Sequence, residues 1–193
     1  DYTKALYAED IMPEIIPIKE VDLKIIDSTF YRDPMYDEVW GDVNGSINVT
    51  FEDPAESEDY YELSVYSNNE YYDYYDSTLH VNRYKIDFTS NDPLVETSGD
   101  YNTTLFFTDE VLNGQNYKLE LDFEDWNANG NTKYEVELLC LSRAAYLYRR
   151  SIREYNQSSE DPFSEPVVIY SNIENGFGIF AGYNTSNHVV SLF

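Results

Sequence analysis

Apolar and polar side chains alternate with a period of two along most of the chain. The alternation is clearest at residues 47–51, 61–65, 84–88, 117–123 and 134–138. Each of these stretches would bury one face and hydrate the other, which is typical of strands in antiparallel sheets. Shorter apolar or aromatic runs predict further strands at 21–26, 103–107, 167–170 and 178–183.

Turn-forming residues separate these stretches at short intervals. They include Asp53-Pro54, Asn91-Asp92-Pro93, Asn113-Gly114 and Asn129-Gly130. Short alternating strands joined by such turns indicate a β-sandwich. Residues 47–65 also resemble the second and third strands of an immunoglobulin-like or fibronectin-type-III domain, so the predicted fold is mainly β: an antiparallel Ig/fibronectin-III-like β-sandwich of about seven to nine strands.

One late segment, about residues 142–155, departs from this period. It contains neither Gly nor Pro, and Ser142 is a suitable N-cap for a helix. We therefore expect one inserted α-helix here, with a stripe that packs on the sandwich and consists of Ala145, Tyr148, Ile152 and Tyr155.

The expected helix carries four arginines, a third of all basic residues in the chain. One interpretation is that they neutralise an acidic body and favour the negative end of the helix dipole. The other is an anionic-ligand site formed by Arg149, Arg150 and Arg153. We favour the first, because charge runs are usually solvated faces.

The formal net charge is −25, with 12 Lys+Arg against 37 Asp+Glu. Such a surface repels nucleic acid and anionic lipid headgroups, so we expect no nucleic-acid partner. An aromatic content of 17% argues for a packed domain rather than a disordered acidic chain. The single cysteine, Cys140, lies in an apolar run and is expected to be a buried core residue.

Residues 1–17 differ from the rest of the chain. Met12-Pro13 and Ile16-Pro17 favour an extended linker, because each proline disfavours helix at its predecessor. We expect residues 1–17 to be the end of a preceding domain with its linker, and residues 18–193 to be a β-sandwich domain with the inserted helix. The sequence opens on Asp1 and shows no signal peptide, so we expect either a cytosolic protein or a trimmed domain.

A tyrosine cluster lies within residues 33–82, which hold thirteen Asp or Glu and no Lys or Arg. Its members are Tyr71, Tyr72, Tyr74 and Tyr75. They could close over the edge of the sandwich within a solvated loop. Alternatively they could form a binding surface, because tyrosine offers a large amphipathic contact area to protein partners or sugars.

A partial calcium-loop pattern, D-x-N-x-N-G, is formed by Asp125, Asn127 and Asn129 with Gly130. Val136 stands where the bidentate Glu of such a loop belongs, and Asn129-Gly130 is also a favoured two-residue hairpin turn. Metal binding is therefore the weaker interpretation. No sequence motif of a hydrolase, nucleotide-binding loop or metalloprotease occurs, so we expect neither catalytic residues nor a cofactor.

Residues 161–183, DPFSEPVVIYSNIENGFGIFAGY, resemble the C-terminal signature of domain-of-unknown-function family 4249. Residues 8–18 resemble that family's link between its first and second β-domains, and residues 142–155 the helix before the signature. The resemblance covers nearly the whole chain. It implies an outer-membrane lipoprotein of the Bacteroidota at the cell surface, although the lipid anchor itself is not in this sequence.

The family has no assigned activity, and its members tend to be encoded beside TonB-dependent outer-membrane transporters. The resemblance therefore implies an accessory role in transport or assembly. It also makes Ser28 and Ser77 candidates for O-glycosylation, because each stands in an Asp-Ser-Thr triplet of the type used in that phylum.

We carry three functional hypotheses. The first is a non-catalytic surface-lipoprotein module that binds a partner protein, such as an outer-membrane transporter, through an exposed apolar or aromatic patch. The second is a glycan or small-ligand binding module in which the tyrosine cluster lines a groove with convergent polar groups. The third, a carboxylate-dependent hydrolase, would need two facing carboxylates in a cleft. We expect no enzyme.

Overall fold

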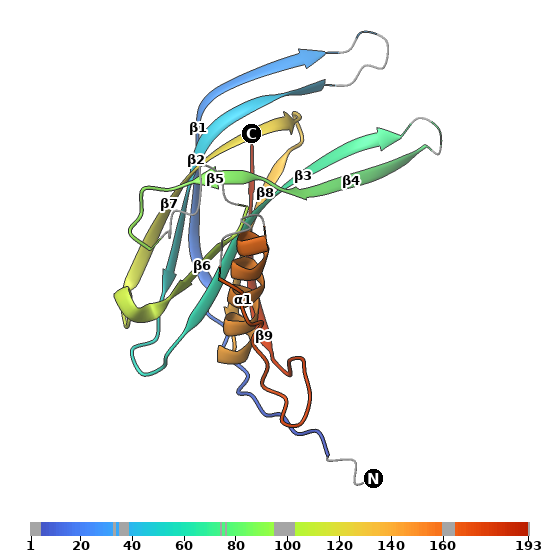
Figure 1. The fold of residues 1–193 in the computed structure, drawn as a ribbon. Helices are drawn as coiled ribbons and strands as arrows, with labels where there is room; N and C mark the ends of the chain where they lie inside the picture. The colour runs from blue at the N-terminus through green and yellow to red at the C-terminus, as the bar shows by residue number, and fades with distance from the viewer. Residues whose placement is uncertain are drawn as a thin grey trace.

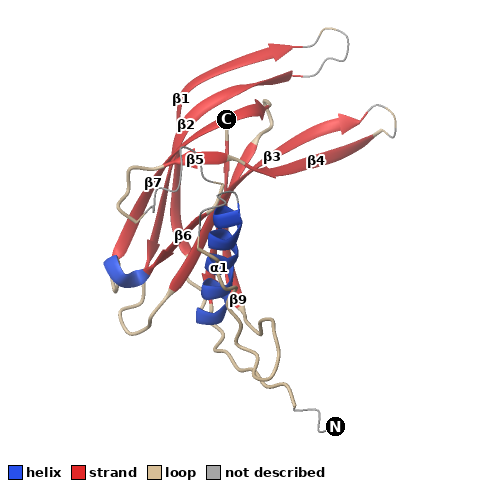
Figure 2. Cartoon of the chain, viewed as in Figure 1, coloured by secondary structure: helices blue, strands red, loops and turns tan. Residues whose placement is uncertain are grey.

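The computed structural model describes residues 5–32, 34, 39–73, 75, 77–94, 103–159 and 165–192. These residues form a β-sandwich of two antiparallel sheets with one α-helix (Figures 1 and 2). The predicted fold class, a mainly β sandwich with one late helix, is therefore confirmed.

The first sheet has the strand order β1-β2-β7-β5. Its strands are β1 (Ile18–Arg32), β2 (Val39–Glu52), β7 (Asn116–Ala128) and β5 (Asp87–Thr89). The second sheet has the order β4-β3-β8-β9. Its strands are β4 (Thr78–Lys85), β3 (Tyr60–Asp73), β8 (Lys133–Leu141) and β9 (Tyr183–Ser191).

One edge of β3 is shared by two partners. The first residues of β3 pair with β6 (Leu105–Thr108), and its last residues pair with β4. A short 3-10 helix, η1 (Asp109–Val111), follows β6 directly. The start of β3 and the start of η1 consequently lie next to each other, although the two are far apart in the sequence.

The alternating apolar residues of β2, β3, β7 and β8 fill the space between the sheets. Ile47, Leu63, Leu121 and Leu138, one from each strand, have no exposed surface. Burying a side chain of this kind contributes about 1.5–3 kcal/mol relative to leaving it in water. The period-two pattern therefore predicted these four strands and their inward faces correctly.

The predicted strand at residues 84–88 is divided between the two sheets. Tyr84 belongs to β4 in the second sheet and Phe88 to β5 in the first, while Ile86 is buried at the crossing. The Ile86 N–H donates to the Val65 carbonyl at 3.0 Å, which fixes the crossing point. Both halves turn apolar side chains toward the same core, so alternation alone cannot show that the chain changes sheet.

The predicted strands at 167–170 and 178–183 are wrong, as is the expectation that the signature supplies the last strands. Residues 165–182 run without ladder partners except for one bridge between Tyr7 and Glu174. The side-chain amide of Asn172 binds both backbone groups of Phe180, as the backbone of a neighbouring strand would. It accepts from the Phe180 N–H at 2.9 Å and donates to the Phe180 carbonyl at 2.7 Å. The last strand is the more polar β9.

The helix α1 (Arg143–Ser159) begins where the sequence predicted, and the Ser142 hydroxyl accepts the Ala145 N–H at 3.2 Å. It covers the second sheet through Ala145 and Tyr146, which pack with residues of β3 and β8 (Figure 2). Tyr155, expected on this face, is instead 47% exposed. Ala145 of the predicted stripe packs on the sheet as expected, and Arg149 adds to the contact by pairing with a carboxylate of β3.

Two glycines of the signature, Gly176 and Gly182, lie against side chains of the N-terminal segment. A Cβ on Gly176 would lie 2.8 Å from Leu6 Cδ2, and one on Gly182 would lie 2.5 Å from Met12 Sδ. The segment continues into the core at Ile16, whose N–H contacts the Cys140 sulfur at 3.3 Å. Cys140 is buried as expected, and burial raises the pKa of its thiol to about 11.

Candidate functional site

The two sheets diverge toward the ends of the β1–β2 and β3–β4 hairpins (Figure 1). A groove of about 1000 Å³ is lined by residues near these ends. Trp40 of β2 and Tyr71 and Tyr72 of β3 are among its lining residues. The turn between β7 and β8 contributes the rest of the lining. The groove therefore combines residues that are distant in the sequence but are brought together by the two hairpins.

The aromatic side chains of the groove are half-exposed, yet neighbouring rings hold them in place. Trp40 is 49% exposed, and its ring centroid lies 5.0 Å from that of Tyr31 on the paired strand. Tyr71 is 45% exposed and stacks on His80 at 5.6 Å across the β3–β4 ladder. An aromatic ring that packs against a neighbouring ring and is still partly exposed to solvent can contact a ligand with little loss of conformational entropy.

Side-chain amides supply the polar part of the lining. Those of Asn82, Asn127 and Asn131 are exposed and line the groove. Within the described residues no partner binds these three amides, so each offers two N–H donors and one carbonyl acceptor. The amides of Asn69 and Asn129, by contrast, are committed to Tyr84 and to the Glu70 carbonyl.

The groove carries little uncompensated charge, in contrast to the rest of this acidic chain. Its one carboxylate, Glu70, accepts from Lys133 Nζ at 2.6 Å. Asp125 lies outside the lining and is buried, and its oxygens accept from Ser67 and Tyr84, each at 2.7 Å. Neutral ligands with hydroxyl groups suit such a lining better than ions do.

A comparison with known protein families identifies the family of this chain. The family model described as domain of unknown function DUF4249 matches residues 5–188. The chain belongs to the DUF4249 family. No curated protein and no solved structure matches it. The predicted membership is thereby confirmed, while the family itself carries no assigned activity.

The tyrosine cluster of this DUF4249 chain is only partly in the groove. Tyr71 and Tyr72 line it, as the binding hypothesis expected, whereas Tyr75 is fully exposed at the hairpin turn. Tyr74 lies outside the described residues. Trp40 was not predicted as a site residue, because it lies near the tyrosines only in the three-dimensional arrangement of the β1–β2 and β3–β4 hairpins.

The arginines of α1 point to separate partners instead of a common ligand. Arg149 pairs with Glu62 on β3, Arg150 Nε donates to Glu154 at 2.9 Å, and the Arg153 guanidinium lies 5.4 Å from the centre of the Phe106 ring. This arrangement supports the charge-neutralising interpretation over an anionic-ligand site.

The partial calcium loop has a structural role in the DUF4249 fold. Asp125 Oδ1 also accepts the Asn127 N–H, and Asn129 Oδ1 accepts the Asn131 N–H at 2.9 Å. These bonds shape the end of β7 and the turn after it. Metal binding by Asp125, Asn127 and Asn129 stays an untested prediction, as does glycosylation of Ser28 and Ser77, both of which are exposed.

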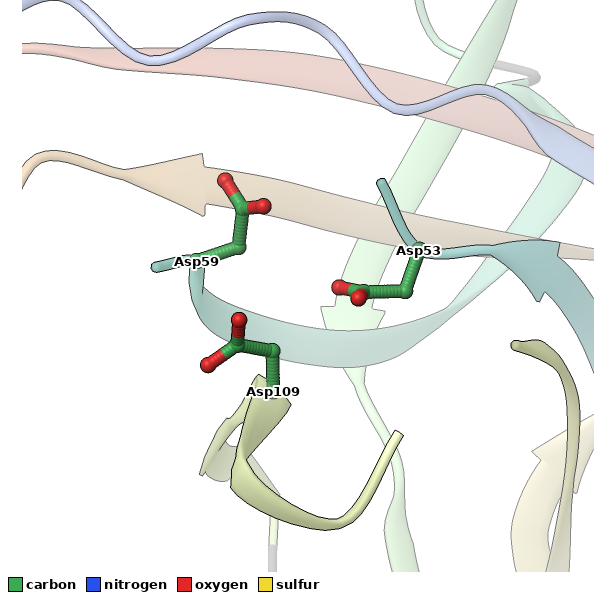
Figure 3. Close-up of side chains that lie close together, drawn as sticks. All are labelled: Asp53, Asp59 and Asp109. Atoms are coloured by element: carbon green, nitrogen blue, oxygen red, sulfur yellow. The ribbon is translucent and has the colours of Figure 1, made fainter. Parts of the chain in front are cut away.

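A cluster of three carboxylates lies away from the groove, at the other end of β2 (Figure 3). Asp53, Asp59 and Asp109 each place one oxygen within 4.8 Å of the other two. Burial raises the pKa of Asp59 and Asp109, and the neighbouring Asp53 charge raises both further. Local sequence could not reveal this cluster, because the pairing of β6 with β3 is what brings Asp109 to the other two.

Among the described residues, no helix combines the length and apolar character that a membrane-spanning helix needs.

Proposed function

We propose that this DUF4249 domain is a non-catalytic binding module whose groove between the β1–β2 and β3–β4 hairpins holds a neutral glycan. One observation carries the proposal: Trp40, Tyr71 and Tyr72 line the same groove as three exposed amides without partners in the described residues. Aromatic faces bind the apolar C–H faces of sugar rings, and amides bind their hydroxyl groups.

The charge of the chain restricts the ligand to neutral molecules. A protein with a net charge of −25 repels polyanions such as nucleic acid and sulfated glycans. Lysine neutralises the one carboxylate of the lining, so a cation gains little there as well. The groove volume of about 1000 Å³ is at the upper end of typical small-ligand sites and suits an oligosaccharide better than a single sugar.

Isothermal titration calorimetry with a panel of neutral oligosaccharides tests the proposal. We expect a bound member of the panel to lose at least about tenfold in affinity with Trp40→Ala and with Tyr71→Ala. Trp126→Ala is the matched control, because its indole is 64% exposed but lies outside the groove lining. Absence of binding across the panel, or equal losses in all three variants, would contradict the proposal.

A second candidate function, binding of a partner protein, is favoured by a different surface. The signature and the N-terminal segment each expose large apolar side chains, including Phe177 (98% exposed) and Val168 (86%) in the signature and Ile11 (85%) in the N-terminal segment. Fully exposed apolar clusters usually mark protein contacts. We propose an accessory role beside a TonB-dependent outer-membrane transporter for this surface, in a lipid-anchored protein at the cell surface.

A photocrosslinking residue at Phe177 tests this second function. With a purified transporter encoded beside a DUF4249 protein, we expect a crosslink from position 177 and none from position 81. Val81 is the control because it is apolar and 59% exposed but lies on β4. Crosslinking of equal yield from both positions would contradict a specific surface.

A further inference from the structure

Three aspartates from two separate parts of the chain, the β2–β3 loop and the start of η1, converge at one end of the sandwich (Figure 3). Asp53 follows β2, Asp59 precedes β3, and Asp109 is the first residue of η1. The Asp109 N–H donates to the Asp59 carbonyl at 3.2 Å, which fixes the two side chains relative to each other. The convergence is therefore built into the backbone of the fold.

The cluster is buried and has no compensating positive charge. Asp53 is 2% exposed, Asp109 3% and Asp59 8%. None of the ion pairs among the described residues includes any of the three. Buried carboxylates that are neither paired nor bound to a metal are strongly disfavoured, because water is removed from them without replacement.

Asp109 also has an unsatisfied acceptor. Its Oδ2 atom is inaccessible to solvent and has no hydrogen-bond partner. By contrast, Asp53 accepts from the Tyr61 hydroxyl and from the Gly114 N–H at 3.0 Å, and Asp59 accepts from the Ser57 hydroxyl at 2.6 Å. The Asp109 side chain projects from η1 toward the other two carboxylates (Figure 3).

We propose that Asp53, Asp59 and Asp109 bind a hard divalent cation, with Ca²⁺ as the preferred ion. The donors are all oxygens, which favours Ca²⁺ or Mg²⁺ over zinc or copper. Three convergent carboxylates favour Ca²⁺ over Mg²⁺, because Mg²⁺ dehydrates reluctantly and is usually held by only one or two protein carboxylates. One oxygen of each aspartate lies within 4.8 Å of the other two, which is close enough for all three to share one ion.

The cluster has an entry route for a hydrated cation. Asp59 lines a surface groove of about 1040 Å³ between the N-terminal segment and the β2–β3 loop. The same groove is lined by five further acidic residues: Glu9, Asp10, Glu14, Glu56 and Glu58. A groove lined by one sign of charge raises the local concentration of the opposite ion, and water in it can complete the coordination.

Thermal unfolding of the purified chain after chelator treatment tests the site. At a hundredfold excess of Ca²⁺ over its dissociation constant, we expect the Tm to rise by about 5 to 10 °C. Mg²⁺ at the same concentration should give a smaller rise, since Mg²⁺ dehydrates reluctantly and usually takes only one or two protein carboxylates. A wild-type chain that does not respond to Ca²⁺, or that responds equally to Mg²⁺, would overturn the proposal.

Charge-neutralising variants locate the effect. We expect Asp109→Asn and Asp59→Asn to abolish the Ca²⁺-dependent rise in Tm, and Glu56→Gln to keep it, because Glu56 is an exposed acid of the adjoining loop and not a member of the cluster. An unchanged rise in the aspartate variants, or its loss in Glu56→Gln, would assign the effect to general screening and overturn the site.

Terbium luminescence of the wild-type chain provides a readout that does not depend on the variants folding. Tyr61 donates to the Asp53 carboxylate, so Tb³⁺ in the site should be sensitised through tyrosine. We expect Ca²⁺ to displace this luminescence with a single dissociation constant that matches the thermal titration. Luminescence that Ca²⁺ does not displace would count against the site.

Discussion

Ser142 and Gly182 bind each other reciprocally: the Ser142 N–H donates to the Gly182 carbonyl at 2.9 Å, and the Gly182 N–H donates to the Ser142 hydroxyl at 3.2 Å. The same hydroxyl caps the start of α1 by accepting the Ala145 N–H. One serine therefore joins the helix to the end of the signature segment, just before β9.

Replacing this serine should weaken both connections. We expect Ser142→Ala to lower the free energy of unfolding by about 1–2 kcal/mol, because a helix cap and a second buried hydrogen bond are lost together. Urea unfolding at neutral pH measures the change. Ser158→Ala, near the other end of α1, should change stability by less than about 0.5 kcal/mol; an equal loss in both variants would show that Ser142 has no special role.

A side chain at Gly182 should displace the N-terminal segment. The Cβ of Gly182→Ala would lie 2.5 Å from Met12 Sδ, so the methionine side chain must move and its contact with the signature is lost. We expect faster proteolysis within residues 5–17, with recovery in the Gly182→Ala, Met12→Ala double variant. Gly130→Ala, whose Cβ would meet no atom within 4 Å, is the control. Unchanged proteolysis of Gly182→Ala would contradict the packing described above.

The outer face of the second sheet should contribute a pH-dependent part of the stability. Burial would raise the pKa of Glu135, but hydrogen bonds from Arg83 and Asn68, together with the Arg83 charge, outweigh it and lower the pKa. The contribution is therefore present above the ordinary glutamate pKa of about 4.3 and is lost as the pH falls through the lower folded-state value.

The matching experiment compares Glu135→Gln with the wild type across pH. We expect the variant to be less stable by about 1 kcal/mol at pH 7 and the difference to vanish at pH values below the folded pKa. Urea unfolding at several pH values measures it, with Glu154→Gln as the control, because the Glu154 pair with Arg150 is solvent-exposed. A difference that grows toward low pH would have the wrong sign.

The amides of the groove should affect binding without affecting folding. Asn82 and Asn127 are exposed, and no partner among the described residues binds their side-chain amides. We expect Asn82→Ala and Asn127→Ala to weaken glycan binding by about 1 kcal/mol each, with unchanged thermal stability. Calorimetry and thermal unfolding of the same samples separate the two effects. Asn69→Ala is the contrasting variant: its amide is buried in a network with Tyr84 and Thr132, so it should lose stability.

The sequence predicted the parts of the fold that depend on local alternation. The inward residues of β2, β3, β7 and β8 follow from it directly, because one buried face imposes a period of two. The predicted strand at residues 84–88 failed at Ile86, where the chain crosses between sheets that share one core. β9 escaped prediction because its residues are mostly polar and partly exposed at a sheet edge.

The residues of the groove and of the acidic cluster could likewise be predicted only in part from the sequence. Tyr71 and Tyr72 were identified because several tyrosines lie close together in one acidic stretch of the sequence. Trp40 is distant from them in the sequence and joins them only through the arrangement of the β1–β2 and β3–β4 hairpins in the fold. Asp53 and Asp59 are close in the sequence, yet Asp109 joins them through the pairing of β6 with β3. A site that is assembled by long-range strand pairing has no local sequence pattern from which it could be predicted.

Trp40 offers the most direct test of ligand binding in the groove. The chain has two tryptophans, so Trp126→Phe leaves Trp40 as the only indole reporter. We predict that a neutral oligosaccharide which binds in calorimetry changes the intensity and emission maximum of Trp40 fluorescence in a saturable way, with the same dissociation constant. A bound oligosaccharide that leaves Trp40 fluorescence unchanged in Trp126→Phe, while altering Trp126 fluorescence in Trp40→Phe, would place the ligand elsewhere and contradict the proposed function.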